Sequence, residues 1–212
     1  MHLPDGVVHV GLAAGGYAGA VLLAALSLRR ISRQPDPVAQ VPRAAMLTAV
    51  FFVASLVHIP MPPTSVHLFL SGLVGILLGW MAFPVILIGL FFQAVMFGHG
   101  GITTLGLNGL ILGLPALGAA GLWRLGRGAS RTRAGAMGLA FTGAAGAVLL
   151  GVVLFASILL AGLPAAVDRD LERRAVLALA TAHGPLALIE GLVTAATIGF
   201  LHRAGSDLLR GG

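Results

Sequence analysis

Apolar residues dominate this chain in long runs, and short polar, basic or proline-rich segments separate the runs. Seven runs are expected to be membrane-spanning helices, at 8–28, 43–59, 67–82, 85–97, 102–122, 134–163 and 185–201. The longer runs reach the length of about 20 residues that a helix needs to cross a bilayer. The pattern predicts an all-α integral membrane protein with one transmembrane domain over 1–212, preceded by a short segment at 1–7.

Prolines and glycines mark the breaks between the expected spans. The segment PMPPTS at 60–65 ends the second span, and Thr64 or Ser65 can cap a third helix that begins at His67. Pro84 is expected to separate the third span from the fourth, and GHGG at 98–101 to form a flexible turn. The charged stretch at 168–182 is expected to be a surface helix.

Composition removes several classes of function. The chain is 58% hydrophobic and 9% charged, with mean hydropathy +0.99, which is far from the composition of a soluble domain. It has no cysteine, which excludes disulfides and thiolate ligands. It also has no lysine, so it cannot itself be a Walker-type ATPase, because the phosphate-binding loop needs one.

The placement of charge predicts the topology. All thirteen basic residues are arginines, and two clusters of them lie at 29–33 and 124–133. Basic loops stay on the cytoplasmic side, so seven spans place the N-terminus outside and the C-terminus inside the cytoplasmic (inner) membrane. Six of the seven histidines then lie in or beside outer segments (His2, His9, His58, His67, His99 and His183). Since histidine is the commonest transition-metal ligand, this one-sidedness favours a metal site.

The first two residues can make most of such a site. The α-amine of Met1, the Met1-His2 peptide nitrogen and His2 Nδ1 can close two chelate rings around one cation, provided that the amine is free. We expect Met1 to be retained, since His2 is a large second residue. A plane of nitrogens suits Ni(II), Cu(II) or square-planar Co(II) rather than Mg²⁺ or Ca²⁺. The alternative is a histidine that happens to lie in a frayed terminus.

His67 is the expected fourth ligand. It follows the rigid turn that contains Ser65, and its imidazole would complete a four-nitrogen plane. The alternative is a histidine bonded to nearby backbone at the start of a helix. His9 is interpreted as structural, His58 as a residue of the membrane interface, and His99 as an exposed loop residue or a ligand on the entry path; none is placed in the metal site.

Other polar residues are expected to support the site. Asp5 can orient His2 or accept hydrogen bonds that fold residues 1–6 into the bundle. Glu190 lies within a span, where an ionisable side chain is costly, and it is seven residues from His183 on the same helix face. We interpret this pair as support for the metal ligands or as a tie for the N-terminal segment. Asn108 and Gln93 are expected to make hydrogen bonds between helices, or to support that segment.

Four separated motifs resemble the CbiM/NikM membrane proteins: MHLPDG at the start, PMPPTSVHL at 60–68, FGHGGITTLGLNG at 97–109 and AHGPLALIEG at 182–191. That family comprises the substrate-capturing components of energy-coupling-factor cobalt and nickel importers. The resemblance implies a six-helix core with an extra N-terminal helix, and a metal held by Met1, His2 and His67. It also implies partners: a membrane coupling protein, two cytosolic ATPase subunits and a small two-span accessory protein.

The expected function is therefore capture of Ni²⁺ or Co²⁺ as transported substrate, with no enzymatic activity in this chain. A planar nitrogen set serves both metals. Two other functions stay open at this point. One is a substrate-binding component for an organic vitamin, which the low aromatic content of 6% disfavours. The other is a membrane-embedded metalloenzyme, which the absence of an HExxH motif disfavours.

Overall fold

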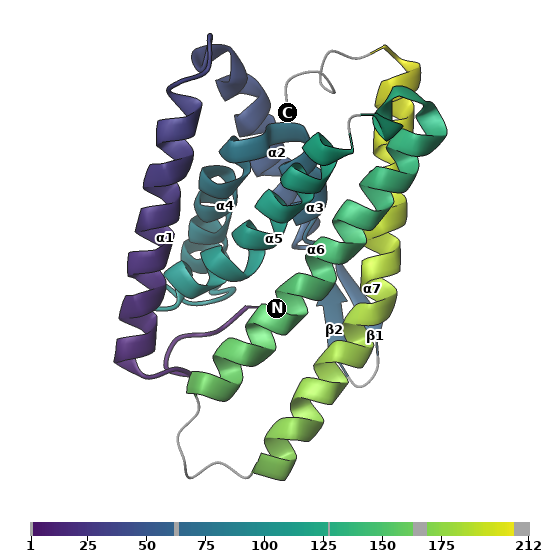
Figure 1. Ribbon diagram of the computed structural model, residues 1–212. Helices are drawn as coiled ribbons and strands as arrows, with labels where there is room; N and C mark the ends of the chain where they lie inside the picture. The colour runs from purple at the N-terminus through teal and green to yellow at the C-terminus, as the bar shows by residue number, and fades with distance from the viewer. Residues whose placement is uncertain (1, 62–63, 127, 163–168, 206–212) are drawn as a thin grey trace.

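The computed structural model describes residues 2–61, 64–126, 128–162 and 169–205. Its α-helices are α1 (Val10–Ile31), α2 (Val41–Ala54), α3 (Ser71–Leu78), α4 (Ala82–Phe97), α5 (Leu105–Leu125), α6 (Arg133–Gly162) and α7 (Arg169–Arg203). Short 3-10 turns lie at Val38–Gln40 (η1), Gly79–Met81 (η2) and Ala129–Arg131 (η3). The two strands β1 (His58–Met61) and β2 (Thr64–His67) complete the fold (Figure 1).

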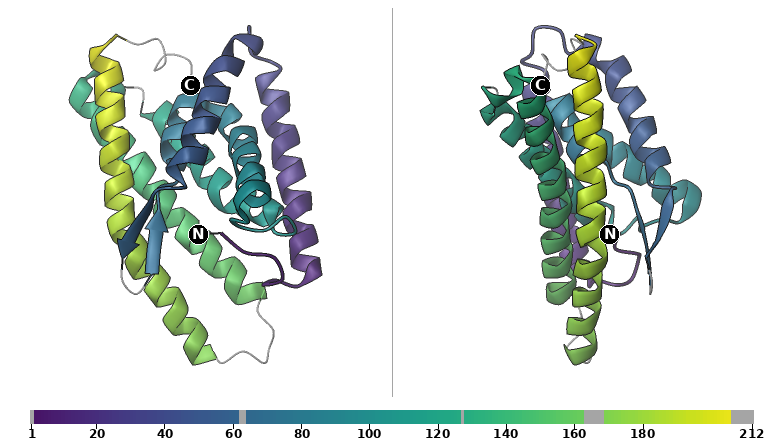
Figure 2. Two further views of the ribbon diagram at one scale, coloured as in Figure 1. Left: turned by 180° about the vertical axis from the view of Figure 1, so that it is seen from behind. Right: turned by 90° about the vertical axis from the view of Figure 1, so that its right-hand side faces the viewer.

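The helices form a bundle whose centre is built from α3, α4 and α5. These central helices are apolar on nearly every side, and their buried side chains include Val74, Ile86 and Ile111. By contrast α1, α6 and α7 leave large apolar side chains such as Leu22, Val153 and Phe200 exposed. Such an outer surface is what lipid contact requires. Figure 2 shows α6 and α7 side by side along one edge of the bundle.

The number of spans differs from the expectation. Five helical stretches in the described residues are long and apolar enough to cross a membrane: 10–31, 71–97, 105–125, 133–162 and 176–203. Residues 38–54 form a shorter apolar helix. The expectation of seven separate long spans is therefore not confirmed, because α3 has only eight residues and belongs to the same stretch as α4.

The expected break at Pro84 is wrong. The chain turns instead at η2, where Gly79 has φ +57°, a conformation that glycine adopts without steric cost. Pro84 lies in the first turn of α4, where the missing N–H of proline would have no intrahelical partner in any case.

A β-hairpin replaces the loop expected before the third span. β1 and β2 pair antiparallel, with His58 opposite His67 and Met61 opposite Thr64. His67 is thus the last residue of a strand, and the expectation that it begins a helix is wrong. The fold is α-helical apart from this hairpin in the described residues.

Close packing of α1 on α5 fixes the N-terminal part of the chain. A Cβ atom on Gly106 would lie 2.5 Å from the backbone nitrogen of Tyr17, and one on Gly16 would lie 3.0 Å from the backbone nitrogen of Leu107. These contacts leave no room for larger side chains. Gly16 on α1 and Gly106 on α5 therefore allow these two helices to pack closely.

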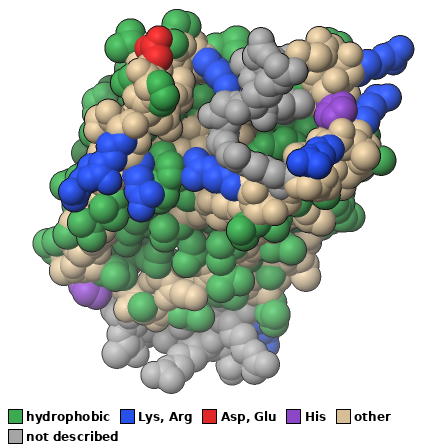
Figure 3. Space-filling view, turned by 45° about the horizontal axis from the view of Figure 1, so that its top comes forward, with side chains coloured by type: hydrophobic (Ala, Val, Ile, Leu, Met, Phe, Trp, Pro, Cys, Tyr) green, Lys and Arg blue, Asp and Glu red, His purple; other side chains and the backbone are tan. Residues whose placement is uncertain are grey.

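Arginines gather at one end of the bundle (Figure 3). They lie at the ends of three helices and in a short turn: Arg29 and Arg30 in α1, Arg124 in α5, Arg131 in η3 and Arg203 in α7. The described histidines other than His202 lie toward the opposite end of these helices. This charge asymmetry is typical of a membrane protein with a cytoplasmic basic face.

Candidate metal centre

The N-terminal segment is folded into the bundle by hydrogen bonds to α5. The backbone N–H of Leu3 donates to Asn108 Oδ1 at 2.8 Å, and Asn108 Nδ2 donates to the Leu3 carbonyl at 3.0 Å. The Thr104 hydroxyl donates to the same carbonyl at 2.5 Å. Leu3 is fully buried. Asn108 therefore supports the N-terminal segment, the second of its two expected roles.

Asp5 makes a second set of bonds to the chain just before α5. Its carboxylate accepts the Thr103 hydroxyl at 2.5 Å and the backbone N–H groups of Thr103 at 2.8 Å and Ile102 at 3.2 Å. The Thr103 hydroxyl, helped by these backbone N–H groups, lowers the pKa of Asp5 below its ordinary value. The prediction that Asp5 folds the terminal residues back into the bundle is confirmed.

Glycines allow this docking. Gly6 has φ +80°, which turns the chain from the docked segment toward α1. Gly101 packs directly against Asp5, since a Cβ there would lie 2.6 Å from the Asp5 backbone nitrogen. His9 then caps α1 by accepting the Leu12 N–H at 3.2 Å, which agrees with its interpretation as a structural residue.

Glu190 fixes the backbone that follows His67. Its carboxylate accepts the N–H groups of Phe69 and Leu70, the latter at 2.9 Å, and its side chain is fully buried. A carboxylate at the N-terminus of α3 is favoured by the helix dipole. Leu70 has φ +52°, so the chain turns sharply at this point into α3. Glu190 on α7 thus positions the β2–α3 connection.

His183 acts on the same connection. Its ring stacks on Phe69 with centroids 6.2 Å apart and an interplanar angle of 13°, and its Nδ1 lies 2.8 Å from the Leu179 carbonyl oxygen. The pair His183 and Glu190 therefore ties the segment that carries His67 and Phe69. Of the two roles expected for this pair, these contacts favour support of a predicted metal ligand, His67, over a tie for the N-terminal segment.

His99 lies in the turn between α4 and α5. Gly98 and Gly100 on either side have φ +59° and +84°, and the His99 backbone N–H donates to the Gln93 carbonyl at 3.1 Å. The turn directs the His99 ring inward, onto His67, and half-buries it. The interpretation of His99 as an exposed loop residue is wrong, and the alternative of a ligand on the entry path stays a prediction.

Three imidazoles meet where these segments converge. One ring nitrogen from each of His2, His67 and His99 lies within 4.8 Å of the other two. The Nε2 atoms of His67 and His99 are 3.1 Å apart, and the His2 ring centroid lies 5.1 Å from that of His67 and 4.5 Å from that of His99. The segments come from positions 2, 67 and 99, so tertiary folding alone brings them together.

These separations fit one metal ion. Metal–nitrogen bonds of about 2.0–2.1 Å put two ligand nitrogens at right angles about 2.9 Å apart, and opposite ligands about 4.1 Å apart. The His67–His99 distance is close to the first value. The largest separation of 4.8 Å exceeds the second, so the rings must close by less than about 1 Å around an ion.

The environment keeps His2 neutral. Burial lowers the pKa of the His2 imidazole well below its ordinary value of 6.5, and the neighbouring imidazoles of His67 and His99 lower it further. A neutral imidazole is the form that binds metal. The described site is therefore prepared for a cation at neutral pH without first losing a proton from His2.

Some of the residues expected in the site lie wholly or partly outside the described part of the chain. Met1 lies outside the described residues, as does the side chain of Ser65, whose backbone belongs to β2 opposite Pro60. The side chain of His58 is likewise outside. Gln93 was not placed in the site from the sequence; it is fully buried, and its backbone carbonyl accepts the N–H of His99. Its signal in the sequence is a polar side chain six residues before His99 in an apolar helix.

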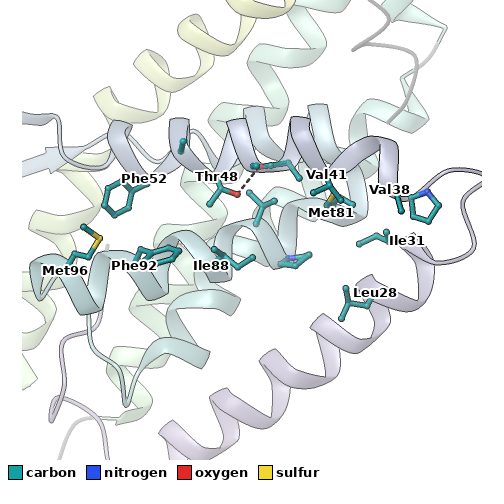
Figure 4. Close-up of a pocket in the computed structure, with 16 residues that line it drawn as sticks. Leu28, Ile31, Val38, Val41, Thr48, Phe52, Met81, Ile88, Phe92 and Met96 are labelled. Carbon is teal, nitrogen blue, oxygen red and sulfur yellow. Dashed lines mark hydrogen bonds between the residues drawn. The ribbon is translucent and has the colours of Figure 1, made fainter.

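A groove on the bundle surface has a different character. It lies between α1, α2 and α4, has a volume of about 730 Å³ and is lined by apolar side chains such as Leu28, Phe52 and Phe92 (Figure 4). Its one polar side chain, Thr48, donates to the Ala44 carbonyl at 2.8 Å. The described residues that line this groove include no histidine or carboxylate, so the groove offers none of the groups that usually bind a transition metal.

Comparison with known proteins identifies relatives over the whole chain. A family described as "Cobalt uptake substrate-specific transmembrane region" (CbiM) matches residues 2–208. The cobalt transport protein CbiM of Sorangium cellulosum is 30% identical, with coverage of 99% of this chain and 94% of the relative. The fused nickel transport protein NikMN of Rhodobacter capsulatus is 35% identical, covering 99% and 64%.

A putative metal transport protein of Haemophilus influenzae is 40% identical over 58% of each chain. The chain spans about three fifths of the length of this relative and of the Rhodobacter protein. Two solved structures of transition metal transporters share the fold, with TM-scores of 0.72 and 0.77 at 23% and 22% identity. They cover 99% and 96% of this chain and are themselves covered to 99% and 93%.

Proposed function

Because this chain belongs to the CbiM family, we propose that it is the substrate-capturing membrane component of an ATP-driven importer of nickel or cobalt ions. One observation carries the proposal: imidazole nitrogens of His2, His67 and His99 lie within 4.8 Å of one another, with His67 buried and the other two half-buried. The relatives are metal transport proteins rather than enzymes, and we assign this chain no catalytic role.

The proposed ligands are nitrogens. His2 contributes its imidazole and its peptide nitrogen, Met1 its α-amine, and His67 its imidazole. His99 adds a further imidazole, because its Nε2 lies 3.1 Å from that of His67, near the separation of adjacent ligands on one ion. Nitrogen ligands of this kind favour late divalent transition metals over Mg²⁺ or Ca²⁺. The transported substrate is accordingly Ni²⁺ or Co²⁺.

The proposed orientation places the cluster on the outer side of the cytoplasmic membrane. The arginine-rich end of the bundle then faces the cytoplasm, in accord with the distribution of basic residues around membrane spans. ATP hydrolysis is assigned to separate subunits, since this chain has no lysine for a phosphate-binding loop. The proposed partners are a membrane coupling protein, two cytosolic ATPases and a small accessory protein with two spans.

Metal binding by the purified chain tests the proposal. We expect one Ni²⁺ or Co²⁺ per chain after equilibrium dialysis, and loss of that ion in His2→Ala and His67→Ala variants. His202→Ala is the matched control, because this half-buried histidine lies in the last turn of α7 and is not one of the three clustered histidines. A tag fused ahead of Met1 should also weaken binding, because the Met1 nitrogen then belongs to a peptide bond and is no longer a free amine.

Other outcomes would contradict the proposal in distinct ways. A bound organic molecule without metal would indicate a vitamin-binding component. Stoichiometric zinc with hydrolytic activity would indicate a metalloenzyme. If the chain binds metal, reconstitution with the partner subunits should give uptake that depends on ATP and is lost in His67→Ala; uptake by the lone ATPases and coupling protein would contradict the assigned role.

A further inference from the structure

Gln93 is a buried amide with an unmet hydrogen-bonding requirement. Its side chain is fully buried in α4, and neither Nε2 nor Oε1 has a hydrogen-bond partner among the described residues. An unsatisfied buried amide costs about 1–3 kcal/mol. A residue of this kind in the middle of a packed bundle therefore needs a physical reason.

The His2 imidazole is its neighbour and has the complementary requirement. Both ring nitrogens of His2 are buried and lack hydrogen-bond partners among the described residues. Gln93 lies near the C-terminal end of α4, and its backbone carbonyl accepts the N–H of His99, whose ring centroid lies 4.5 Å from that of His2. When Nδ1 of a histidine binds a metal, Nε2 carries the remaining proton and needs an acceptor.

The other polar groups around His2 are already used. Asn108 exchanges two hydrogen bonds with Leu3, and the Asp5 carboxylate is occupied by Ile102 and Thr103. Phe69, whose ring centroid lies 6.1 Å from that of His2, offers no acceptor of comparable strength. Among the described residues at this end of α4, the Gln93 amide is a fully buried neutral acceptor that no other group uses.

We propose that Gln93 is the positioning residue of the metal site: its Oε1 accepts the Nε2–H of His2 and so holds Nδ1 toward the ion. The inference rests on the proposed function. Hydrogen bonding from a ligand imidazole to an outer acceptor fixes the tautomer and orientation of the ring and strengthens it as a donor. Gln93 also fixes the turn behind it, since its backbone carbonyl accepts the N–H of His99 at 3.1 Å.

The test compares three substitutions at position 93. Gln93→Met keeps an unbranched side chain of similar length but removes the acceptor, and should weaken Ni²⁺ and Co²⁺ binding about 10- to 100-fold. Gln93→Glu supplies a stronger acceptor and should keep the metal affinity of the unsubstituted chain, in contrast to Gln93→Met. Gln93→Leu should resemble Gln93→Met. Ser27→Ala is the control, because Ser27, near the C-terminal end of α1, is another fully buried polar residue with no hydrogen-bond partner in the described part of the chain.

A spectroscopic measurement separates positioning from packing. The ligand-field absorption of the Co²⁺- or Cu²⁺-loaded protein reports the donor strength of the imidazole. It should shift in one direction in Gln93→Met and in the opposite direction in Gln93→Glu, relative to the unsubstituted protein. A residue that merely fills space would not produce opposite shifts, and thermal unfolding of each metal-free variant shows whether the bundle is intact.

The inference is overturned if folded Gln93→Met binds metal within threefold of the unsubstituted chain with an unchanged spectrum. It is also overturned if the folded Gln93→Glu protein binds metal as weakly as Gln93→Met does. Failure of the proposed function looks different, because the unsubstituted chain itself would then bind neither Ni²⁺ nor Co²⁺.

Discussion

Replacing Asn108 by alanine should detach the N-terminal segment from α5. The substitution removes both bonds between the Asn108 amide and Leu3. The Leu3 carbonyl keeps its bond to the Thr104 hydroxyl, but the buried Leu3 N–H loses its acceptor. An unsatisfied N–H costs about 1–3 kcal/mol and the second lost bond about 1 kcal/mol, so the docked conformation loses about 2–4 kcal/mol.

This loss should appear in metal affinity, because His2 reaches the other imidazoles only while the segment is docked. If the whole loss of about 2–4 kcal/mol reaches the metal site, Kd increases by about 30-fold to several hundred-fold, at 1.4 kcal/mol per factor of ten. This range is the upper limit of the effect. Competition with a chelator of known affinity, on purified Asn108→Ala and unsubstituted protein, measures it. Asn108→Asp should lose less, since a carboxylate still accepts the Leu3 N–H.

An Asn108→Ala protein that folds normally and binds metal within threefold of the unsubstituted chain would refute the reasoning. It would show that the two bonds to Leu3 do not hold the segment in the conformation that binds the ion. Thermal unfolding is the control for folding. The helix bundle itself should be little affected, because the segment at 2–6 lies outside all seven helices.

Three further predictions follow from the same geometry. Burial lowers the pKa of His2, so docking of the N-terminal segment is fully favourable above pH 6.5 and weakens as the pH falls toward the lowered pKa of His2. Metal affinity measured from pH 7.5 to 5.5 should therefore drop progressively, and a constant affinity would contradict this. Glu190→Gln should raise the metal dissociation rate severalfold in a chelator-chase assay, because a neutral amide holds the Phe69 and Leu70 N–H groups less strongly than a carboxylate does. An unchanged rate would argue against positioning of His67 by Glu190. Gly106→Ala should lower stability by about 1–3 kcal/mol in thermal unfolding because its Cβ meets the Tyr17 backbone, whereas Gly118→Ala, which faces open space on the same helix, should have little effect.

Much of the fold could be predicted because lipid imposes simple rules on a sequence. The ends of the helix predicted at 134–163 lie within a residue of α6, and the expected spans at 8–28 and 102–122 overlap α1 and α5. The resemblance to the CbiM/NikM proteins is confirmed over residues 2–208. Long apolar runs and basic loops carry this information locally, without knowledge of which helices meet.

The β-hairpin could not be predicted in the same way. Proline and small polar residues at 60–65 indicate an interruption but not its form, and pairing of His58 with His67 is a contact between segments. The Glu190 carboxylate that fixes the start of α3 comes from a helix more than a hundred residues later. A rule based on helix caps within one segment therefore put the start of α3 four residues too early.

The site was partly predictable for a similar reason. Asp5 and Asn108 were expected to support the N-terminal segment, since a carboxylate near a terminus and an amide inside a span each need partners. His99 was left out, because its sequence context describes a flexible turn and says nothing about the direction of the ring. The turn is held by the bond from its N–H to Gln93, which depends on the C-terminal end of α4.

X-ray absorption of the nickel- or cobalt-loaded protein tests the central claim most directly, namely that the docked N-terminal segment brings His2 onto one ion together with His67. We expect a first shell made of nitrogen at about 2 Å, with scattering from several imidazole rings. In a His67→Ala protein that still retains some metal, the number of scattering imidazole rings should decrease by one. A shell dominated by oxygen, or a ring count that His67→Ala leaves unchanged, would contradict it.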